Sequence, residues 1–447
     1  MDFGKSMSLK KQDTKGQPFS NTLRNLQPIK QIQKMTANKS IFSSFANQDE
    51  LLKNYKSQPE KAVPNINGHI HTPHSFSAFT SIGQAFQLAK AEGVSVLGIN
   101  DFYTTDGYDE FAELAQKHKI FPLFNIEFMA LQNDLQEAGI RVNDPNNPGR
   151  TYFSGKGLQQ PAKMSEVSAR KIKNLQEESN RQTYEMVEKL NSFLSENNID
   201  IQFNSAELHK NLAKNLFRER HIAQAIRQAV FEKENTEAGR QTLLQKIFSG
   251  KTVKSPIANV AALENEIRGN LLKSGGAAFV TEDPKAFLSL EEVIDLIIDA
   301  GGIPCYPVLL DDPKGVCTDY EANKEKLLQE LVKNDVYSIE LIPGRNDFHI
   351  LKDFVNYFNK NGFVITFGTE HNTPQLDPMK ITCRGGVDLD DELKQINYEG
   401  TAIIAAHQYL IANGKEGYLS DKKAKTDEKE YFIELGRAVI TKFKSPL

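Results

Sequence analysis

The 447-residue sequence predicts an α/β protein, in which a barrel of alternating strands and helices is divided by a helical insertion. Two observations support this fold class. Short apolar runs alternate with amphipathic helical segments over residues 65–128 and again over 290–371, and this alternation is typical of parallel βα units. Between these two regions, residues 164–250 carry helical periodicity alone. A third observation, polar side chains at the ends of several strands, bears on function and is taken up below.

The first region contains three predicted strands and two helices. NINGHIH (65–71) is a short strand, and SIGQAFQLAKAEG (81–93) is a helix that ends at a glycine. VSVLGI (94–99) is a β-branched apolar run that indicates a buried strand. A helix over 106–119 and the strand IFPLFNIEF (120–128) follow. We therefore expect two βα units and a third strand here.

The alternation then stops and later returns. Residues 130–160 are rich in Gly, Pro and Asn and predict an irregular loop, and long amphipathic helices follow it. We expect helices over 290–302, 321–333, 347–362 and 391–414, and strands from 303 and over 336–342 and 363–371. The barrel is thus predicted at 63–129 and 286–415, and the helical insertion at 130–285.

The two ends of the chain differ from the barrel in composition. Residues 1–62 are polar and basic; up to residue 61 they hold eleven Lys or Arg against five Asp or Glu, a net charge of +6. They predict a flexible leader with short helices at 28–35 and 48–56. Residues 416–447 predict a charged tail with a helix at 427–443.

Composition also limits the class of function. With a net charge of -4 overall, the chain outside the basic leader is acidic, which argues against nucleic acid as the main ligand. No apolar run has the length of a membrane span, and no secretory signal is present. The three cysteines, an odd number without CxxC spacing, predict free thiols in a reducing compartment. We expect a cytoplasmic protein.

Potential metal ligands follow four of the predicted strands, where barrel enzymes place their chemistry. His69 and His71 share one face of the first strand, because strand side chains repeat every two residues. The others are listed in chain order: Asp101, Glu127, Glu370 and His371. Imidazole and carboxylate ligands together suit Zn, Mn or Fe. Taken singly, each has a plainer interpretation, since a HxH pair can be a polar strand end and Asp101 a turn former.

These motifs resemble a known family. HIHTPHSFSA, VSVLGINDFYTTDG, LFNIEF and VITFGTEHNTP are similar, in order, to the motifs of PHP (polymerase and histidinol phosphatase) phosphoesterases, over about residues 65–375. FRERHIAQAI (217–226) resembles a segment of the nucleoside-phosphate phosphoesterase subgroup. The resemblance implies a distorted seven-stranded TIM-like barrel. It also implies hydrolysis of phosphate esters by metal-activated water.

The resemblance carries some ligands over and loses others. His69, His71, Glu127 and the Glu370–His371 pair match family ligand positions, and so does His221, which can equally be a helix-capping residue. Where the family has further ligands, this chain has Ala78, Phe102, Tyr152 and Tyr306. The resemblance therefore implies a reduced site that holds one divalent metal per chain.

Basic residues supply candidate phosphate ligands, namely Arg218, Arg220, Arg345 and His74, with Arg384 as a further possibility. The leading hypothesis is a metal-dependent phosphoesterase acting on a small phosphorylated metabolite or nucleotide, in which Asp101 or His371 handles the proton. The alternatives are a catalytically weakened relative that binds a phosphorylated ligand or partner, and a hydrolase of a non-phosphate bond. We expect His407 to be structural.

Overall fold

The computed structural model describes residues 39–59 and 62–445. From residue 40 onward, the described residues form one compact unit. The helix expected at 28–35 and most of the expected leader lie outside the described residues. Among the helices of the described part, none is long and apolar enough to cross a bilayer.

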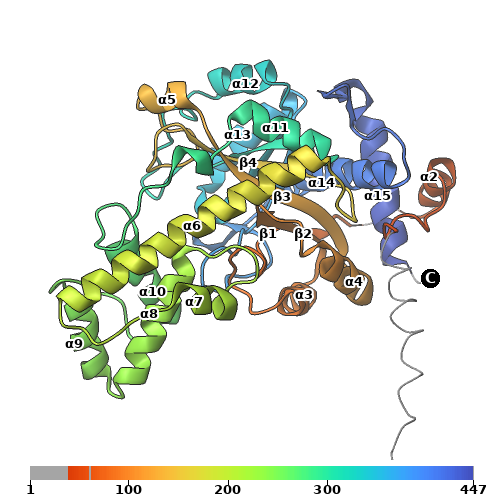
Figure 1. Ribbon diagram of the computed structural model, residues 1–447. Helices are drawn as coiled ribbons and strands as arrows, with labels where there is room; N and C mark the ends of the chain where they lie inside the picture. Colours follow the sequence, from red (N-terminus) through yellow and green to blue (C-terminus); the bar gives the residue numbers. More distant parts are fainter. Residues whose placement is uncertain (1–38, 60–61, 446–447) are drawn as a thin grey trace, which may run out of the picture. The chain divides into compact units, whose positions relative to one another are not determined.

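Seven strands form one sheet that follows the chain order from β1 to β7 (Figure 1). Their bounds are β1 Asn65–Ile70, β2 Val94–Phe102, β3 Phe121–Leu131, β4 Arg150–Lys156, β5 Ile303–Val308, β6 Ser338–Leu341 and β7 Val364–Phe367. Neighbouring strands are parallel except at β4, which runs antiparallel to both β3 and β5. Two short hairpins lie outside this sheet, β8 (Thr382–Cys383) with β9 (Val387–Asp388) and β10 (Leu419–Ser420) with β11 (Lys423–Ala424).

The sheet closes on itself at the carboxyl end of β1. The amide of His71 donates to the carbonyl of Glu370 at 2.7 Å, and the amide of Glu370 donates to the carbonyl of His69 at 2.9 Å. Gly368 permits this approach, because a Cβ atom there would lie 2.3 Å from Cβ of His69. The fold is therefore the expected α/β barrel of seven strands, and its seam brings the first and last motifs together.

Helices cover the outside of the barrel (Figure 1). They are α2 (Gln48–Lys56), α3 (Ile82–Ala91), α4 (Tyr108–His118), α5 (Asn133–Glu137), α11 (Leu290–Asp299), α12 (Lys324–Lys333), α13 (Phe348–Lys360), α14 (Asp391–Ala412) and α15 (Lys429–Lys444). Apart from α5, which falls in the expected loop, each lies close to the range predicted for it. Apolar side chains at helical spacing account for this agreement, since one face of each helix must be buried.

A second group of helices projects to one side of the barrel (Figure 1). It consists of α6 (Glu166–Glu196), α7 (Ser205–Leu212), α8 (Glu219–Lys233), α9 (Glu237–Ile247), α10 (Val260–Ile267) and the π-helical turn η1 (Arg268–Leu272). These helices have their own hydrophobic cluster, which includes Leu190, Ile226 and Leu263. They support the proposed helical insertion, whose outer limits remain a proposal.

Two expectations about irregular segments were wrong. Residues 130–160 are not a loop throughout, because Arg150–Lys156 form β4 in the centre of the sheet. Residues 40–59 are not a free leader, because Phe42 and Leu51 are buried in the barrel core. The helix expected in the tail is present as α15, which packs along α14, and Gly436 lies so close to Ala402 that a side chain would not fit. Apolar side chains anchor each of these polar segments.

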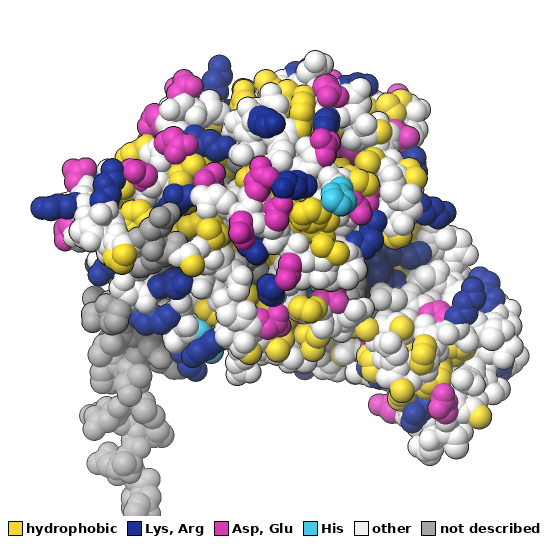
Figure 2. Space-filling view, turned by 180° about the vertical axis from the view of Figure 1, so that it is seen from behind, with side chains coloured by type: hydrophobic (Ala, Val, Ile, Leu, Met, Phe, Trp, Pro, Cys, Tyr) yellow, Lys and Arg dark blue, Asp and Glu magenta, His cyan; other side chains and the backbone are white. Residues whose placement is uncertain are grey.

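The three cysteines are free thiols, as expected. His407 also has the expected structural role, since both ring nitrogens are bonded to backbone groups. On the face that Figure 2 shows, charged side chains of both signs are mixed over the barrel, with apolar patches between them.

Candidate metal centre and pocket

Polar side chains line the inner face of the barrel strands. Every second residue points inward, and at these positions the chain has buried polar side chains, namely Asn67, His69, His71, Asn125, Glu127, Ser154, Lys156, Ser338 and Glu340. Buried polar groups need partners. Most of these groups form hydrogen bonds or ion pairs with one another, and this creates a polar network inside the barrel.

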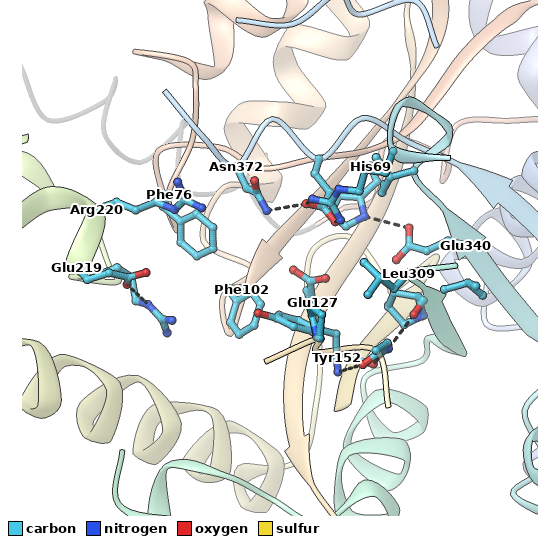
Figure 3. A pocket seen from close by; sticks show the side chains of 18 of the residues that line it. His69, Phe76, Phe102, Glu127, Tyr152, Glu219, Arg220, Leu309, Glu340 and Asn372 are labelled. Atoms are coloured by element: carbon cyan, nitrogen blue, oxygen red, sulfur yellow. Dashed lines mark hydrogen bonds and ion pairs between the residues drawn. The ribbon is translucent and has the colours of Figure 1, made fainter. Parts of the chain in front are cut away.

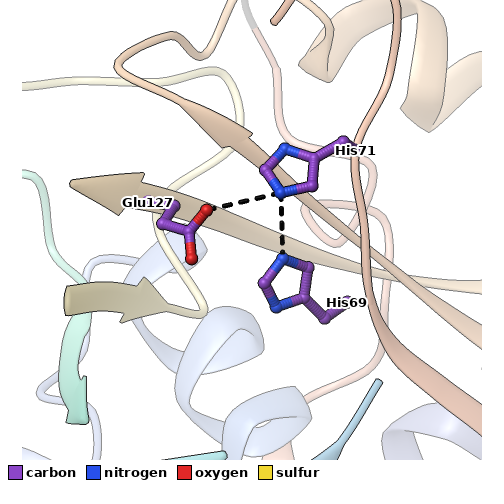
Figure 4. Close-up of side chains that lie close together, drawn as sticks. All are labelled: His69, His71 and Glu127. Carbon is purple, nitrogen blue, oxygen red and sulfur yellow. Dashed lines mark hydrogen bonds and ion pairs between the residues drawn. The ribbon is translucent and has the colours of Figure 1, made fainter. Parts of the chain in front are cut away.

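Three of these side chains converge at the mouth of the barrel (Figure 4). Nε2 of His69 lies 3.4 Å from Nε2 of His71, and Nε2 of His71 lies 3.3 Å from Oε2 of Glu127. One ligand atom from each residue lies within 4.8 Å of the others. The structure thus brings together three residues that the sequence motifs assigned to a metal.

The hydrogen bonds behind the two imidazoles define where their protons are. Nδ1 of His69 lies 3.0 Å from Oε2 of Glu340. Nδ1 of His71 lies 3.2 Å from Oγ of Ser75, whose hydroxyl donates to Asp101 at 2.7 Å. Because the oxygens of Glu340 and Ser75 must accept here, both Nδ1 atoms carry a proton. Both Nε2 atoms then present lone pairs to each other and to Glu127.

This donor set fits a divalent cation. Two facing lone pairs repel unless a cation lies between them. Zn–N bonds of about 2.0–2.1 Å at a tetrahedral angle separate the two nitrogens by about 3.3 Å, and the Nε2 atoms are 3.4 Å apart. Two His and one carboxylate leave a fourth position open, which is typical of catalytic rather than structural zinc.

Burial opposes charge on the ligands themselves. It raises the pKa of Glu127 to about 8, against a smaller opposing effect of His69. It also lowers the pKa of His71. A cation at the centre would stabilise the carboxylate and the neutral imidazole together, so its binding would release a proton below pH 8.

A pocket of about 290 Å³ opens over this group (Figure 3). Barrel residues form one side, including His69, Glu127, Tyr152, Glu340, Arg345 and Glu370. The helical insertion forms the other side with Arg218, Glu219, Arg220, Arg268 and Lys273. The pocket therefore joins a metal-ligand group to a cluster of cations.

Most of the charges around the pocket are already paired. Glu219 lies 3.5 Å from Arg218, 3.0 Å from Arg268 and 3.2 Å from Lys273. Burial raises the pKa of Glu219, but the cations outweigh it and hold that pKa well below its ordinary value. Arg220 differs, because its buried Nη1 has no hydrogen-bond partner among the described residues. Burial, with Arg268 nearby, lowers the pKa of Arg220 to about 10.

Glu370 lies in the pocket but is not free for a metal. Arg345 donates to Glu370 through both terminal nitrogens, one at 2.8 Å, and Asn372 donates at 2.6 Å. Burial raises the pKa of Glu370, but the electrostatic effects of Arg345, His69 and His71 outweigh burial and hold that pKa below its ordinary value. Glu370 and His371 have φ angles of 61° and 51°. This left-handed turn, which non-glycine residues seldom adopt, separates the two side chains.

The remaining expected site residues lie away from the pocket lining. Asp101 accepts bonds from Thr72 and Ser75. His371 is bonded through Nδ1 to Thr369 and through Nε2 to the carbonyl of Asp377.

Three further candidates are also occupied elsewhere. His221 accepts from the amide of Arg218 at 3.0 Å and caps α8, and burial lowers its pKa to about 4. His74 is bonded to Asn215, and Arg384 to Asp311. For His221 the capping interpretation is thus favoured over metal binding.

The four substituted positions behave differently. Phe102 and Tyr152 line the pocket, where the family's ligands were expected. The Tyr306 hydroxyl donates to Glu321 at 2.9 Å, and neither Tyr306 nor Ala78 is among the pocket-lining residues. None of these side chains is an imidazole, a thiolate or a carboxylate, the usual ligands of these metals.

Sequence reasoning missed Glu340 and Lys156. Nζ of Lys156 lies 2.5 Å from Oε2 of Glu340, and Ser154 donates to Oε1 at 2.7 Å. Glu340 had a detectable signal, since SIEL repeats the polar–apolar alternation of NIE in β3. Lys156 had no such signal, because its segment was predicted to be a loop. Arg268 in η1 and Lys273, which directly follows it, were missed because nothing in the sequence places that turn at the pocket.

Comparison with known proteins agrees with this geometry. Residues 67–253 match the family model of the PHP domain. No curated protein matches the sequence.

Two solved structures resemble this chain. One, from Bifidobacterium adolescentis and provisionally assigned as a metal-dependent phosphoesterase, is 16% identical with a TM-score of 0.48, covering 75% of this chain and 96% of that one. The other, an amidohydrolase from Chromobacterium violaceum with bound sulfate and no metal, is 17% identical with a TM-score of 0.44, covering 72% and 93%.

Proposed function

We propose that this chain, which belongs to the PHP domain family through residues 67–253, is a phosphoesterase that uses one divalent metal. Its substrate is a phosphate ester of a small metabolite or nucleotide. The observation that carries the proposal is the presence, beside one pocket, of three converging metal ligands and of Arg220, whose buried Nη1 has no hydrogen-bond partner among the described residues. A metal and a guanidinium are the two groups that phosphoryl transfer needs most.

The roles of the residues follow from their positions. A bound metal would supply an activated water and a Lewis acid for the phosphate oxygen. Arg220 binds the phosphate, since its free N–H groups suit phosphate oxygens. Arg345 joins it when the Glu370 ion pair opens. The guanidinium carbon of Arg218 lies 5.9 Å from the ring centre of Phe76 and 5.8 Å from that of Phe102. These two rings limit access of bulk water.

The proton-handling role moves to a different residue from those expected. The hydrogen bonds of Asp101 and His371 hold both away from the pocket. Three carboxylates line the pocket outside the three-ligand group, namely Glu219, Glu340 and Glu370. Glu219 and Glu340 are each paired with more than one basic group, whereas among the described residues Glu370 is ion-paired to Arg345 alone. We assign Glu370 the role of proton acceptor once Arg345 has turned to the phosphate.

The test combines metal binding with hydrolysis. Purified protein should bind about one Zn²⁺ or Mn²⁺ per chain and hydrolyse p-nitrophenyl phosphate or a nucleoside monophosphate only with that metal. His71→Ala and Glu127→Gln should abolish hydrolysis and greatly weaken metal binding, because each removes one of three ligands. His349→Ala, which removes an exposed histidine elsewhere, is the matched control and should behave as wild type. Metal-independent hydrolysis, or full activity in His71→Ala, would contradict the proposal.

The Arg345–Glu370 ion pair favours a second candidate, a weakened relative that binds a phosphorylated ligand without rapid turnover. In that case, hydrolysis stays at background while inorganic phosphate still binds to the metal-loaded protein. Binding of phosphate should then be lost in Arg220→Met. Calorimetry with inorganic phosphate, run beside the activity assay, separates the two functions.

A further inference from the structure

Two buried carboxylates lie behind the imidazoles of the metal-ligand group: Glu340 is bonded directly to His69, and Asp101 is connected to His71 through the hydroxyl of Ser75. We propose that Glu340 and Asp101 are positioning residues, which orient His69 and His71 so that both present Nε2 to the metal. This inference rests on the proposed function, because it concerns the same metal centre. It gives Asp101 a role other than proton transfer, and it assigns one to Glu340.

The first chain of hydrogen bonds, from Glu340 to His69, lies in the barrel interior. Glu340 accepts from Nδ1 of His69 at 3.0 Å and from Lys156 at 2.5 Å, and its other oxygen accepts from Ser154 at 2.7 Å. All four residues are buried, and they come from the three strands β1, β4 and β6. Figure 3 shows Glu340 beside the ring of His69 on the barrel side of the pocket. Three bonds fix the Glu340 carboxylate, so the imidazole has one favoured orientation.

Asn100 does not compete for the metal-facing nitrogen. Its Nδ2 lies 3.2 Å from Nδ1 and 3.0 Å from Nε2 of His69. A donor aligned with the Nε2 lone pair would be much closer to Nε2 than to Nδ1. The amide therefore lies beside the ring, and the Nε2 lone pair stays directed at His71 and Glu127.

The second chain of hydrogen bonds, from Asp101 to His71, includes the hydroxyl of Ser75. Ser75 accepts from Nδ1 of His71 at 3.2 Å and donates to Oδ1 of Asp101 at 2.7 Å. The amide of Thr72 also donates to Oδ1, at 2.7 Å, and its hydroxyl donates to Oδ2 at 2.5 Å. Because the carboxylate of Asp101 can only accept, the Ser75 hydroxyl gives its proton to Oδ1 and presents a lone pair to Nδ1 of His71. Asp101 thus determines, through Ser75, which nitrogen of His71 faces the centre.

The two chains of hydrogen bonds have the same effect through different contacts: each fixes a proton on Nδ1 and leaves Nε2 facing the centre. If either ring turned over or exchanged its proton, an N–H group would point at the other imidazole and at a cation. Outer partners of metal-bound histidines act in this way, and their loss weakens metal binding by roughly 10–100-fold.

The experiment measures Zn²⁺ affinity and the Co²⁺ absorption spectrum of the full chain, neither of which requires activity. Glu340→Gln should weaken Zn²⁺ binding by roughly 10–100-fold and alter the Co²⁺ bands. Ser75→Ala should do the same through His71. Glu264→Gln is the matched control, because Glu264 is a buried carboxylate that is ion-paired to Arg227 in the insertion. Its Zn²⁺ affinity should equal that of wild type.

A crossed pair of variants separates positioning from general damage. In a His69→Ala background, Glu340→Gln should have no further effect on Zn²⁺ affinity, whereas Ser75→Ala should still weaken it. If Glu340→Gln does not fold, Ser154→Ala removes one bond to the same carboxylate and should give a smaller loss of affinity.

Two results would overturn the inference while leaving the proposed function intact. One is a Zn²⁺ affinity of Glu340→Gln and Ser75→Ala within twofold of wild type. The other is an effect of Glu340→Gln that persists undiminished without His69. A wild-type chain that binds no Zn²⁺ would instead overturn the proposed function, and the inference with it.

Discussion

Single residues inside the barrel combine charge with near-complete burial. The side chains of Lys156 and Glu340 are 1% and 2% exposed, and their atoms approach to 2.5 Å. Burial raises the pKa of Glu340, but Lys156 and His69 outweigh it and hold that pKa well below its ordinary value. Such a pair is costly to break, because the remaining charge has no water to solvate it.

Replacing Lys156 tests this directly. Lys156→Met should lower the free energy of unfolding by roughly 3–5 kcal/mol, since it leaves a buried carboxylate without its cation. Urea denaturation followed by circular dichroism measures the change.

Lys171→Met is the control for this substitution. Lys171 pairs with Glu292 at 2.9 Å on the surface, where its side chain is 34% exposed. Pairs of that kind contribute about 0–1 kcal/mol. An equal loss of stability in both variants would show that the Lys156–Glu340 pair has no special cost.

Individual elements show how a buried histidine can fix a helix against its neighbours. His407 in α14 donates from Nε2 to the carbonyl of Gly301 at 2.7 Å and accepts at Nδ1 from the amide of Tyr418 at 3.0 Å. Only the neutral ring can do both. Burial lowers the pKa of His407 to about 4.

This pKa predicts an acid sensitivity. The folded-state pKa lies below the unfolded value of about 6.5, so the unfolded chain takes up a proton first as pH falls. Stability linked to His407 is therefore fully present above pH 6.5 and falls by roughly 3 kcal/mol between pH 6.5 and 4. His407→Gln should be less stable at pH 7.5 yet lose less stability on acidification. Thermal melts across this pH range measure the difference, and parallel curves would contradict the assignment.

At the scale of the whole molecule, the chain has two hydrophobic clusters within one compact unit. The insertion has its own cluster, yet it supplies one side of the pocket. Its stability therefore bears on substrate binding, because Arg220 and Glu219 lie at the start of α8.

Hydrogen exchange can show whether the insertion opens on its own. Ile226→Ala, in the insertion cluster, should cost roughly 2–5 kcal/mol and speed amide exchange mainly in α6, α8 and α10. Ile339→Ala in β6 is the matched substitution in the barrel, since both side chains are fully buried. It should speed exchange in the barrel strands. Uniform acceleration across the chain in both variants would indicate a single cooperative unit.

Much of the barrel was predictable from local pattern. The apolar runs and helical stripes give the outer helices and six of the seven strands, because burial of one face requires these periods. β4 was missed because it follows a Gly- and Pro-rich stretch and pairs antiparallel with both of its neighbours, outside the parallel βα alternation. Its Lys156 was missed with it.

The sequence alone determined six of the seven strands and, through the spacing of His69 and His71 and the end of β3, the three residues that converge. Only the tertiary structure decided which candidates remain available: Glu370 is held by Arg345, whereas the buried Nη1 of Arg220 has no acceptor in the described part of the chain. Strand and helix periods depend on neighbouring residues, but ion pairing depends on distances between segments that only folding sets.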